Sequence, residues 1–347
     1  MKIFLPFKNE LNPYLEEIII NSAHTFVYDS YNKYNASYDI VNIHWPEAIY
    51  EWMEPTSKEL EDLEKNILEW KKNSVLIYTK HDYQRNKGTT SNFTKLFKLI
   101  ELHSDIFIHL GHYSKNLYEQ KYPNAKHEIV FHPIFENSLE IYSKRKARKL
   151  LGIDQDDIVI IAPGNIRSFK ERKMVLKSFK SIKLSNKVLI STNMRSELQH
   201  DFPGRVRMRQ FFDVQTFFVE RFKHKHLPPK FIFNYGVMDT RSLSLRMSAA
   251  DVVLVPRVDI LNSGIVFLGL SFGKVIVGPA VGNIEEQLKE LSFPIFNPHS
   301  ISSVAQALNK GIKISINEND IKKPLAKYSA INVAKEFDRI LLNINKS

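Results

Sequence analysis

The feature that most constrains the fold of this 347-residue chain is a regular alternation of short apolar runs with longer amphipathic stretches. Strands alternating with helices require parallel crossovers, so the pattern predicts an α/β doubly wound sheet. In the first part of the chain, strands are expected at 3–5, 38–43, 75–78 and 106–108, and helices at about 12–23, 56–72 and 92–103.

The same alternation starts again after Gly152, which predicts a second α/β domain. Its expected elements are strands at 158–161, 187–190, 231–233, 251–255 and 274–277, with helices at about 171–183 and 263–272. The stretch 133–150 is polar and then basic, without a strand signal. The resulting division is an N-terminal domain (1–135), a linker (136–152), a second domain (153–330), and a C-terminal helix (331–347) that could pack back on the first domain. Residues 200–230 read as an insertion whose structure the sequence does not predict.

Composition excludes several classes of protein. The chain has no cysteine, so neither a disulfide framework nor a thiolate metal site is possible. No apolar run approaches the ~18 residues of a membrane span, and the first residues lack the features of a secretion signal. We therefore expect a cytoplasmic protein, which could be peripheral on the inner face of the membrane.

Charge is distributed unevenly. The chain has 49 lysines and arginines against 38 aspartates and glutamates, a net charge of +11. Residues 1–150 are neutral overall, whereas 167–230 hold 16 basic and 5 acidic residues, which equals the whole excess. Such a block indicates an anionic partner: a nucleic acid, a lipid headgroup or a phosphorylated small molecule.

Two α/β domains joined by one linker predict a cleft, and ligands of such folds bind beyond the carboxyl ends of the strands. The stretch from Gly164 to Lys170 directly follows a buried strand and opens a helix. A glycine turn and a helix N-terminus favour an anion there, and Arg167 and Lys170 are suited to bind phosphate oxygens. An ordinary strand-to-helix turn explains the same residues equally well.

Two more segments follow strands of the second domain. Asn262, Ser263 and Gly264 open a helix, which makes a second anion cradle or simply a helix cap. The glycine-bounded loop from Gly278 leads to Glu285 at the head of another helix, where a carboxylate is favourable for the helix dipole. A structural role and a functional role are equally compatible with that loop.

In the first domain, His44, Trp45 and His81 each follow a strand. A histidine beside a developing charge can donate a hydrogen bond or move a proton near pH 7. The alternative for both histidines is a satisfied hydrogen bond in the core. Trp45 is suited to stack on a sugar or to pack internally, and His112 and His132 show no distinguishing signal.

Other chemistries lack their motifs. The chain contains no Walker loop, no Gly-x-Ser-x-Gly elbow and no Gly-x-Gly-x-x-Gly fingerprint. His224-Lys225-His226 has neither the spacing nor the partner ligands of a zinc site.

Six short motifs in one order resemble the GT-B fold glycosyltransferases, nearest to the large retaining group that includes bacterial mannosyl- and glucosyltransferases of polysaccharide assembly. The motifs are Asn12-Pro13-Tyr14, His44-Trp45-Pro46, Thr79-Lys80-His81-Asp82, His132-Pro133, Gly164 to Lys170 and Leu261 to Gly264. The resemblance covers most of the chain and is weakest over 200–230. It implies two Rossmann-like domains that face a cleft.

The resemblance also implies roles. The second domain would bind a nucleotide-sugar donor, with Arg167 and Lys170 on the diphosphate and the helix start at 262–264 beneath it. The first domain would bind a glycan or lipid-linked acceptor, and His81 matches the histidine beside the transferred sugar. Enzymes of this fold generally need no bound metal, so no cofactor is expected. Nucleic acid is then not expected as a partner, and the basic block that the donor leaves unexplained could meet an anionic membrane surface.

The chain departs from the commoner members of this group, which carry two glutamates where it has Leu261 and Gly269. The ribose and sugar contacts therefore stay unassigned. The expected activity is transfer of a sugar from a nucleotide-diphosphate donor, in cell-surface polysaccharide biosynthesis. The alternatives are a catalytically silent nucleotide-sugar-binding subunit and a GT-B fold epimerase or phosphorylase.

Overall fold

The computed structural model of this chain describes residues 1–8, 12–85, 88–195, 214–314 and 325–344. The chain divides into two compact units. Unit 1 comprises Met1–Pro133 and Ala326–Ser347, and unit 2 comprises Ile134–Leu325. The last part of the chain therefore belongs to the same unit as the first.

Unit 1 is built on a six-stranded parallel sheet in the order β2-β1-β3-β4-β5-β6. Its strands are β1 (Lys2–Leu5), β2 (Thr25–Tyr28), β3 (Ile40–Ile43), β4 (Val75–Lys80), β5 (Ile106–His109) and β6 (Lys126–Ile129). Its helices are α1 (Pro13–Asn21), α2 (Ser57–Trp70), α3 (Ser91–His103), α4 (His112–Lys121) and α13 (Ala330–Ile344), with 3-10 turns η1 (Tyr31–Lys33) and η2 (Pro46–Tyr50). The expected doubly wound α/β fold is confirmed for this unit.

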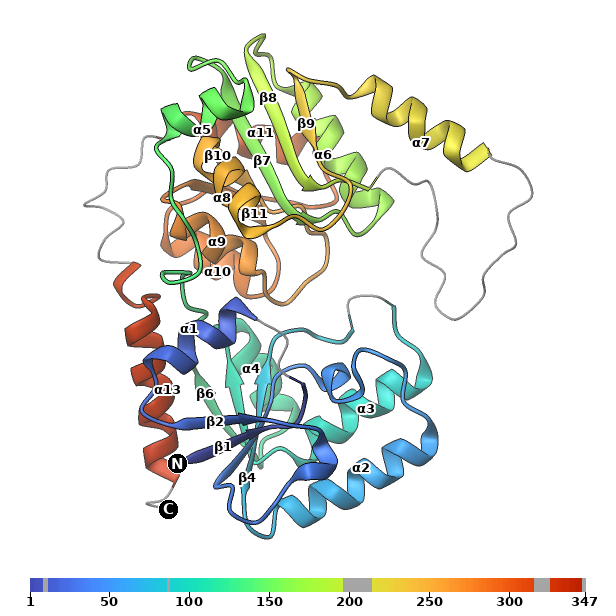
Figure 1. Ribbon diagram of the computed structural model, residues 1–347, viewed down its shortest axis with the longest axis vertical. Coiled ribbons are helices and arrows are strands. Elements are labelled where there is room, and N and C mark those ends of the chain that lie inside the picture. The colour runs from blue at the N-terminus through green and yellow to red at the C-terminus, as the bar shows by residue number, and fades with distance from the viewer. Residues whose placement is uncertain (9–11, 86–87, 196–213, 315–324, 345–347) are drawn as a thin grey trace. The chain divides into compact units, whose positions relative to one another are not determined.

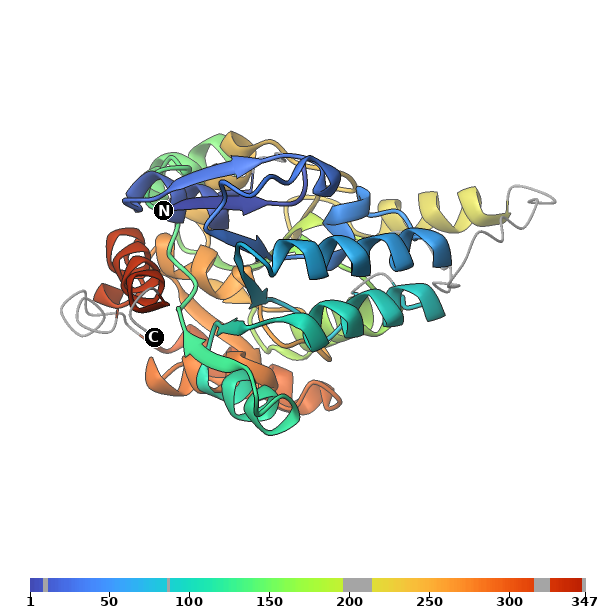
Figure 2. The same cartoon turned by 90° about the horizontal axis from the view of Figure 1, so that it is seen from below.

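Local signals explain where these helices begin. The Asn12 side chain accepts a hydrogen bond from the backbone of Tyr14 and caps α1. Thr56 and Glu59 form a reciprocal capping box at the start of α2. Helices α2 and α3 lie side by side (Figures 1 and 2).

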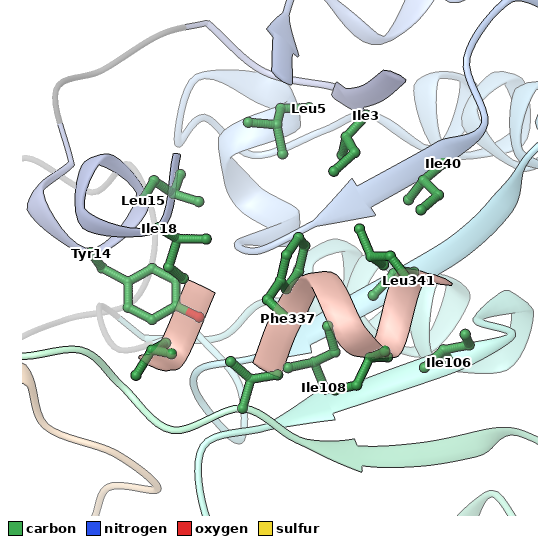
Figure 3. Packing of buried hydrophobic residues seen from close by; sticks show 14 of the residues in the cluster. Ile3, Leu5, Tyr14, Leu15, Ile18, Ile40, Ile106, Ile108, Phe337 and Leu341 are labelled. Carbon is green, nitrogen blue, oxygen red and sulfur yellow. The ribbon is translucent and has the colours of Figure 1, made fainter. Parts of the chain in front are cut away.

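The C-terminal helix α13 completes the core of unit 1. It packs along α1, and Phe337 and Leu341 lie among side chains of the sheet (Figure 3). Asp338 adds polar contacts, because its carboxylate accepts hydrogen bonds from the Ser22 hydroxyl at 2.6 Å and the Ala23 backbone at 2.8 Å. Segments more than 300 residues apart in sequence therefore share one hydrophobic core.

Unit 2 has a second six-stranded parallel sheet, in the order β12-β11-β10-β7-β8-β9 (Figure 1). Its strands are β7 (Ile158–Asn165), β8 (Lys187–Asn193), β9 (Phe231–Phe233), β10 (Val252–Leu254), β11 (Val275–Pro279) and β12 (Ile295–Phe296). Its helices are α5 (Lys144–Leu151), α6 (Phe169–Ser181), α7 (Val214–Lys225), α8 (Thr240–Ala249), α9 (Gly264–Ser271), α10 (Gly282–Glu290) and α11 (Ile301–Ile312). Counted within the unit, this is the Rossmann order 3-2-1-4-5-6.

The linker expected over 136–152 is wrong in its second half. Ser143 caps a helix, α5, which ends at Gly152 in the left-handed conformation. Arg148 is buried and ties this helix to the sheet, since its guanidinium donates to the Asp251 carboxylate at 2.7 Å and to the Ala249 carbonyl at 3.2 Å. The helix was not predicted because the residues before Arg148 are basic. An amphipathic helix can begin with such residues, since only one side of it faces the protein.

The insertion predicted over 200–230 falls partly outside the described residues, which resume with α7 at Val214. Within the described part of the chain, no helix is long and apolar enough to cross a membrane.

Candidate active site

The order of the strands identifies the edge of each sheet where a ligand belongs. In unit 2 the chain moves from β7 outward to β9 and then returns to the other side of β7 with β10. Ligands of doubly wound sheets bind beyond the carboxyl ends of the strands at this reversal point. The segment from Gly164 begins at the end of β7, and the Asn262 segment lies in the loop after β10, so both candidate segments lie at the expected edge.

A glycine turn at the end of β7 leads directly to the N-terminus of α6. Gly164 has a φ of 75°, a conformation that favours glycine, and its N–H donates to the Thr192 hydroxyl at 2.8 Å. Ser168 caps α6, so Arg167 and Lys170 flank a helix N-terminus. Arg167 is half-buried and Lys170 is exposed. Two cations at a positive helix end favour a bound anion.

A buried ion pair fixes this loop to the loop after β10. Nη1 of Arg257 lies 3.3 Å from Oε2 of Glu171, and both side chains are at most 7% exposed. The same nitrogen donates to the Asn165 carbonyl at 3.0 Å, while Oε2 of Glu171 accepts from the Arg167 backbone at 2.6 Å. Because a buried charge needs a partner, this pair sets the conformation of the Arg167 segment.

Two further arginines lie beside the Arg167 segment. Arg195, after β8, donates to the Arg167 carbonyl at 2.7 Å, and Arg172 donates to the Arg195 carbonyl at 3.1 Å. Burial lowers the pKa of Arg172, and the neighbouring charge of Arg195 lowers it further. The described part of this edge therefore carries a marked excess of positive charge.

Sequence reasoning assigned no role to Arg257 or Arg195. Each follows the end of a strand of the sheet, which is the signal that could have identified them. We call Arg167, Lys170, Arg172, Arg195 and Arg257 the arginine cluster.

Hydrogen bonds from side-chain and backbone amides hold the N-terminus of α9 in place. Ser263 is the N-cap residue of α9, but its side chain makes no capping hydrogen bond. The Asn262 amide oxygen accepts from Asn283 Nδ2 at 2.7 Å, and the Asn283 backbone donates to the Leu261 carbonyl at 2.9 Å. Gly264 is exposed at the first position of the helix, where the first N–H groups have no partner within the helix itself. This geometry is compatible with a phosphate at the α9 N-terminus.

The loop before α10 packs closely against the loop before α9. Gly282 has a φ of 54°, and a Cβ added there would lie 2.5 Å from the Leu261 carbonyl oxygen. Glycine is therefore required for the close approach of the two loops. Glu285, in the first turn of α10, forms an ion pair with Lys289 at 2.6 Å.

The two positions that bear glutamates in the commoner relatives are apolar and tightly packed here. Leu261 is fully buried, and a Cβ at Gly269 would lie 2.8 Å from Cγ1 of Ile276. These positions contribute packing and no carboxylate.

The candidate residues of unit 1 meet at the corresponding edge of the first sheet. The chain reverses between β1 and β3, and His44 and His81 follow the neighbouring strands β3 and β4. His44 Nδ1 lies 3.1 Å from His81 Nε2. Both rings are buried, with exposed fractions of 2% and 8%. The structure thus brings together two histidines that lie far apart in the sequence.

Aromatic rings enclose this histidine pair. Trp45 stacks on His81 with 4.4 Å between ring centroids, and the edge of Tyr14 approaches His81 at 4.8 Å. His132 lies on the other side of Tyr14, at 4.9 Å. Trp45 therefore makes the internal packing that was one of its two predicted roles. Tyr14 and His132, which were singled out only as parts of the resemblance motifs, belong to this histidine cluster.

Burial keeps these imidazoles neutral. It lowers the pKa of His44 to about 3 and that of His132 to about 4. The pKa of His81 lies well below 6.5, first because of burial and then because of the two neighbouring histidines and Lys80. At neutral pH the cluster provides hydrogen bonds but no positive charge, and His81 is a weak proton acceptor.

The orphan nitrogen of His44 indicates the tautomers of the pair. Nε2 of His44 is buried and has no hydrogen-bond partner within the described part of the protein. An N–H buried without an acceptor is costly, so the His44 proton belongs on Nδ1 and is donated to His81 Nε2. His81 then carries its own proton on Nδ1 and acts as a hydrogen-bond donor.

Glu47 is a third titratable group of this region. It lies in η2, directly after Trp45 and Pro46, and is 5% exposed. Its pKa is raised from 4.5 to about 7, chiefly by burial and also by the charge of Asp82, against the lowering effect of a backbone hydrogen bond and of Arg85 and Lys80. Its Oε2 atom has no hydrogen-bond partner among the described residues. Glu47 was not predicted as a site residue, because nothing in the sequence pattern shows that this carboxyl is buried.

The chain matches no protein-family profile and no curated protein sequence. Its architecture does match solved structures. HepE from Anabaena, in complex with UDP, has a TM-score of 0.64 at 12% identity, with 100% of both chains covered. Sucrose-phosphate synthase from Thermosynechococcus elongatus has a TM-score of 0.62 at 13% identity, and the match covers 91% of this chain and 75% of that one. A glycosyltransferase from Rickettsia africae has a TM-score of 0.60 at 12% identity, and the match covers 99% of this chain and 97% of that one.

These neighbours are GT-B glycosyltransferases, so the chain has the GT-B fold, as the sequence predicts. HepE has also been solved with UDP-glucose, with a TM-score of 0.62. At such low identity the likeness shows the fold alone.

Proposed function

We propose that this protein is a glycosyltransferase that transfers a sugar from a nucleotide-diphosphate donor to a glycan or lipid-linked acceptor. The observation that carries the proposal is the arginine cluster, which lies at the reversal point of unit 2 between two helix N-termini. A diphosphate requires charge neutralisation, and guanidinium groups and helix ends provide it. The binding of UDP and UDP-glucose by HepE, which has the same fold, supports this choice of ligand.

In the proposed reaction, unit 2 holds the donor. Arg167 and Lys170 bind the diphosphate, and the helix start at Asn262, Ser263 and Gly264 lies beneath it. As the sugar leaves, negative charge develops on the diphosphate, and these preorganised donors stabilise it. This chemistry requires no nucleophile from the protein, and we propose that no bound metal takes part.

Unit 1 would hold the acceptor. His44 fixes the tautomer of His81, and we propose that His81 acts as a hydrogen-bond donor that orients a sugar hydroxyl. Since His81 is neutral, its role is orientation rather than proton removal. Orientation of two reactants lowers the barrier without any change of charge. The finer assignment, to assembly of a cell-surface polysaccharide, rests on the motif resemblance.

A screen of UDP, GDP and ADP sugars by thermal shift tests the proposal, because a bound donor raises Tm by mass action. We expect one nucleotide class to stabilise the protein. In calorimetry, Arg167→Ala combined with Lys170→Ala should weaken that donor by 100-fold or more, on the basis of roughly 1.5–3 kcal/mol for each charged contact. Unchanged affinity in the double variant would refute the site. His81→Ala should slow turnover and leave donor affinity intact, and full activity would exclude His81 from the mechanism.

A catalytically silent nucleotide-sugar-binding subunit is the second candidate. It is favoured by Leu261 and Gly269, which occupy the positions of the two glutamates. Slow hydrolysis of the donor sugar by the pure protein, lost in the Arg167 and Lys170 double variant, would argue against it.

A further inference from the structure

Helix α7 of unit 2 has one face packed against the protein. Phe222 lies against the guanidinium of Arg172, with 5.0 Å to the ring centroid, and 4.4 Å from the ring of His226. His226 is buried against Phe231 of the edge strand β9, at 4.9 Å. Figure 1 shows α7 outside the sheet, beyond its β9 edge. The helix is therefore anchored through residues 222 and 226.

Helix α7 also exposes large apolar side chains near its N-terminus, with Phe217 on the face opposite His226 and Phe218 in line with Phe222. Phe217 is 60% exposed and Phe218 is 44% exposed, and their rings contact each other at 5.8 Å. Leu227, just after the helix, is 54% exposed. Phe217, Arg221 and Lys225 follow one another at spacings of four residues and therefore lie along one side of the helix. Aromatic and basic residues thus share an uncovered surface.

The cations of this surface lack acidic partners. Arg221, Lys225 and Lys230 are exposed, and none of them forms an ion pair within the described residues. Lys225 and Lys230 are also close to Lys180 of α6: the pKa of Lys180 is lowered first by partial burial and then by these two charges. Like charges gathered in this way favour a polyanionic partner.

We infer that this surface, formed by Phe217, Phe218, Arg221, Lys225, Leu227 and Lys230, docks the protein on an anionic lipid surface. Basic residues near such a membrane are attracted by its negative potential, and aromatic rings insert at the headgroup level. A nucleic-acid duplex would be attracted by the charges, but its bases are paired inside and would leave two exposed phenylalanines and a leucine without contacts. Binding of a single-stranded oligonucleotide in place of anionic vesicles would overturn the inference. The inference does not require the donor site, although a lipid-linked acceptor would give the docking a purpose.

The test is flotation of the full-length protein with vesicles of neutral phosphatidylcholine and with vesicles that also contain phosphatidylglycerol. We expect binding to the anionic vesicles only. The triple variant Arg221→Gln, Lys225→Gln, Lys230→Gln should bind about 100-fold more weakly, at roughly fivefold for each charge. A matched control that neutralises three exposed lysines of α2 and α3, Lys58→Gln, Lys95→Gln and Lys98→Gln, should bind like the wild type.

The apolar part needs its own variant. Phe217→Ser combined with Phe218→Ser retains every charge and should still reduce binding by about tenfold, because the rings no longer insert. Undiminished binding of either surface variant would overturn the inference, as would equal binding to both kinds of vesicle or to neither. Light scattering that shows a dimer dispersed by the phenylalanine variant would assign the surface to a second copy instead. Titration with UDP, GDP and ADP in every variant separates these outcomes from failure of the donor site.

Discussion

The two sheets of this protein place very different chemistry at equivalent edges. At the reversal point of unit 1, the histidine cluster is buried, aromatic and uncharged at neutral pH. At the reversal point of unit 2, the arginine cluster includes a buried Arg257–Glu171 ion pair, and two helices begin there. One fold thus provides a hydrogen-bonding edge and an anion-binding edge. The contrast supports a division of labour, with the acceptor on unit 1 and the diphosphate on unit 2.

The largest effect is expected from Arg257, the central cation of the charged edge. Arg257→Met leaves Glu171 buried without its partner, so stability should fall by roughly 3–5 kcal/mol, and donor affinity should fall with it. Urea denaturation and calorimetry measure the two effects. In Glu171→Gln, which removes the carboxylate but keeps the shape, the positive charge remains and donor binding should survive better. Equal loss of donor affinity in both variants would show that geometry, rather than charge, makes the site.

Glu47 provides a test on the uncharged edge. Its pKa is about 7 in the folded protein against 4.5 when unperturbed, so the folded state binds the additional proton. The stability from this protonated form is complete below about pH 4.5 and is lost as pH rises through 7. Glu47→Gln should therefore stabilise the protein at pH 8 by up to about 3 kcal/mol, with little effect at pH 4.5. A constant difference across this range would contradict the raised pKa.

Gly282 tests whether loop packing maintains the charged edge. A Cβ there would meet the Leu261 carbonyl, whereas a Cβ at Gly273, which also has a positive φ, would meet nothing within 4 Å. Gly282→Ala should therefore cost about 2 kcal/mol more than Gly273→Ala, and only the former should weaken donor binding. Thermal unfolding and calorimetry of the two variants provide the comparison. An equal loss of stability in the two variants would mean that the loops before α9 and α10 separate easily.

His132 is expected to make a smaller contribution to the pH dependence of stability, opposite in sign to that of Glu47. Its pKa of about 4 lies below the usual 6.5, so the unfolded state binds the additional proton. The stability that His132 contributes is present above about pH 6.5 and is lost as pH falls toward 4. Between pH 7 and pH 5, His132→Asn should lose about 2 kcal/mol less stability than the wild type. Parallel pH profiles would show that His132 is protonated at its ordinary pKa.

Much of this architecture could be predicted from sequence, because fully buried parallel strands are nearly continuous apolar runs. The strands at 158–161 and 75–78 are of this kind, and both were predicted. Strand β6, with the sequence Lys-His-Glu-Ile, lacks that signal because it lies at an edge of the sheet. The burial of the basic helix α5 could not be predicted for a related reason, since Arg148 pairs with Asp251, which is distant in the sequence.

The candidate sites show the same limit. Position after a strand predicted His44, His81 and Arg167, since the ends of parallel strands share an edge. The pairing of Arg257 with Glu171 and the burial of Glu47 depend on three-dimensional packing between segments distant in sequence. Neither the ion pair nor the burial of Glu47 can be predicted from the spacing of residues along the chain.

The most direct test of the central claim compares nucleoside diphosphates with their parent nucleosides by titration calorimetry. If the arginine cluster binds a diphosphate, one of UDP, GDP and ADP will bind at least 100-fold more tightly than its own nucleoside, and this difference will disappear in the Arg167→Ala, Lys170→Ala variant. Equal affinity for the diphosphate and the nucleoside, or a difference that survives in the variant, would contradict the account.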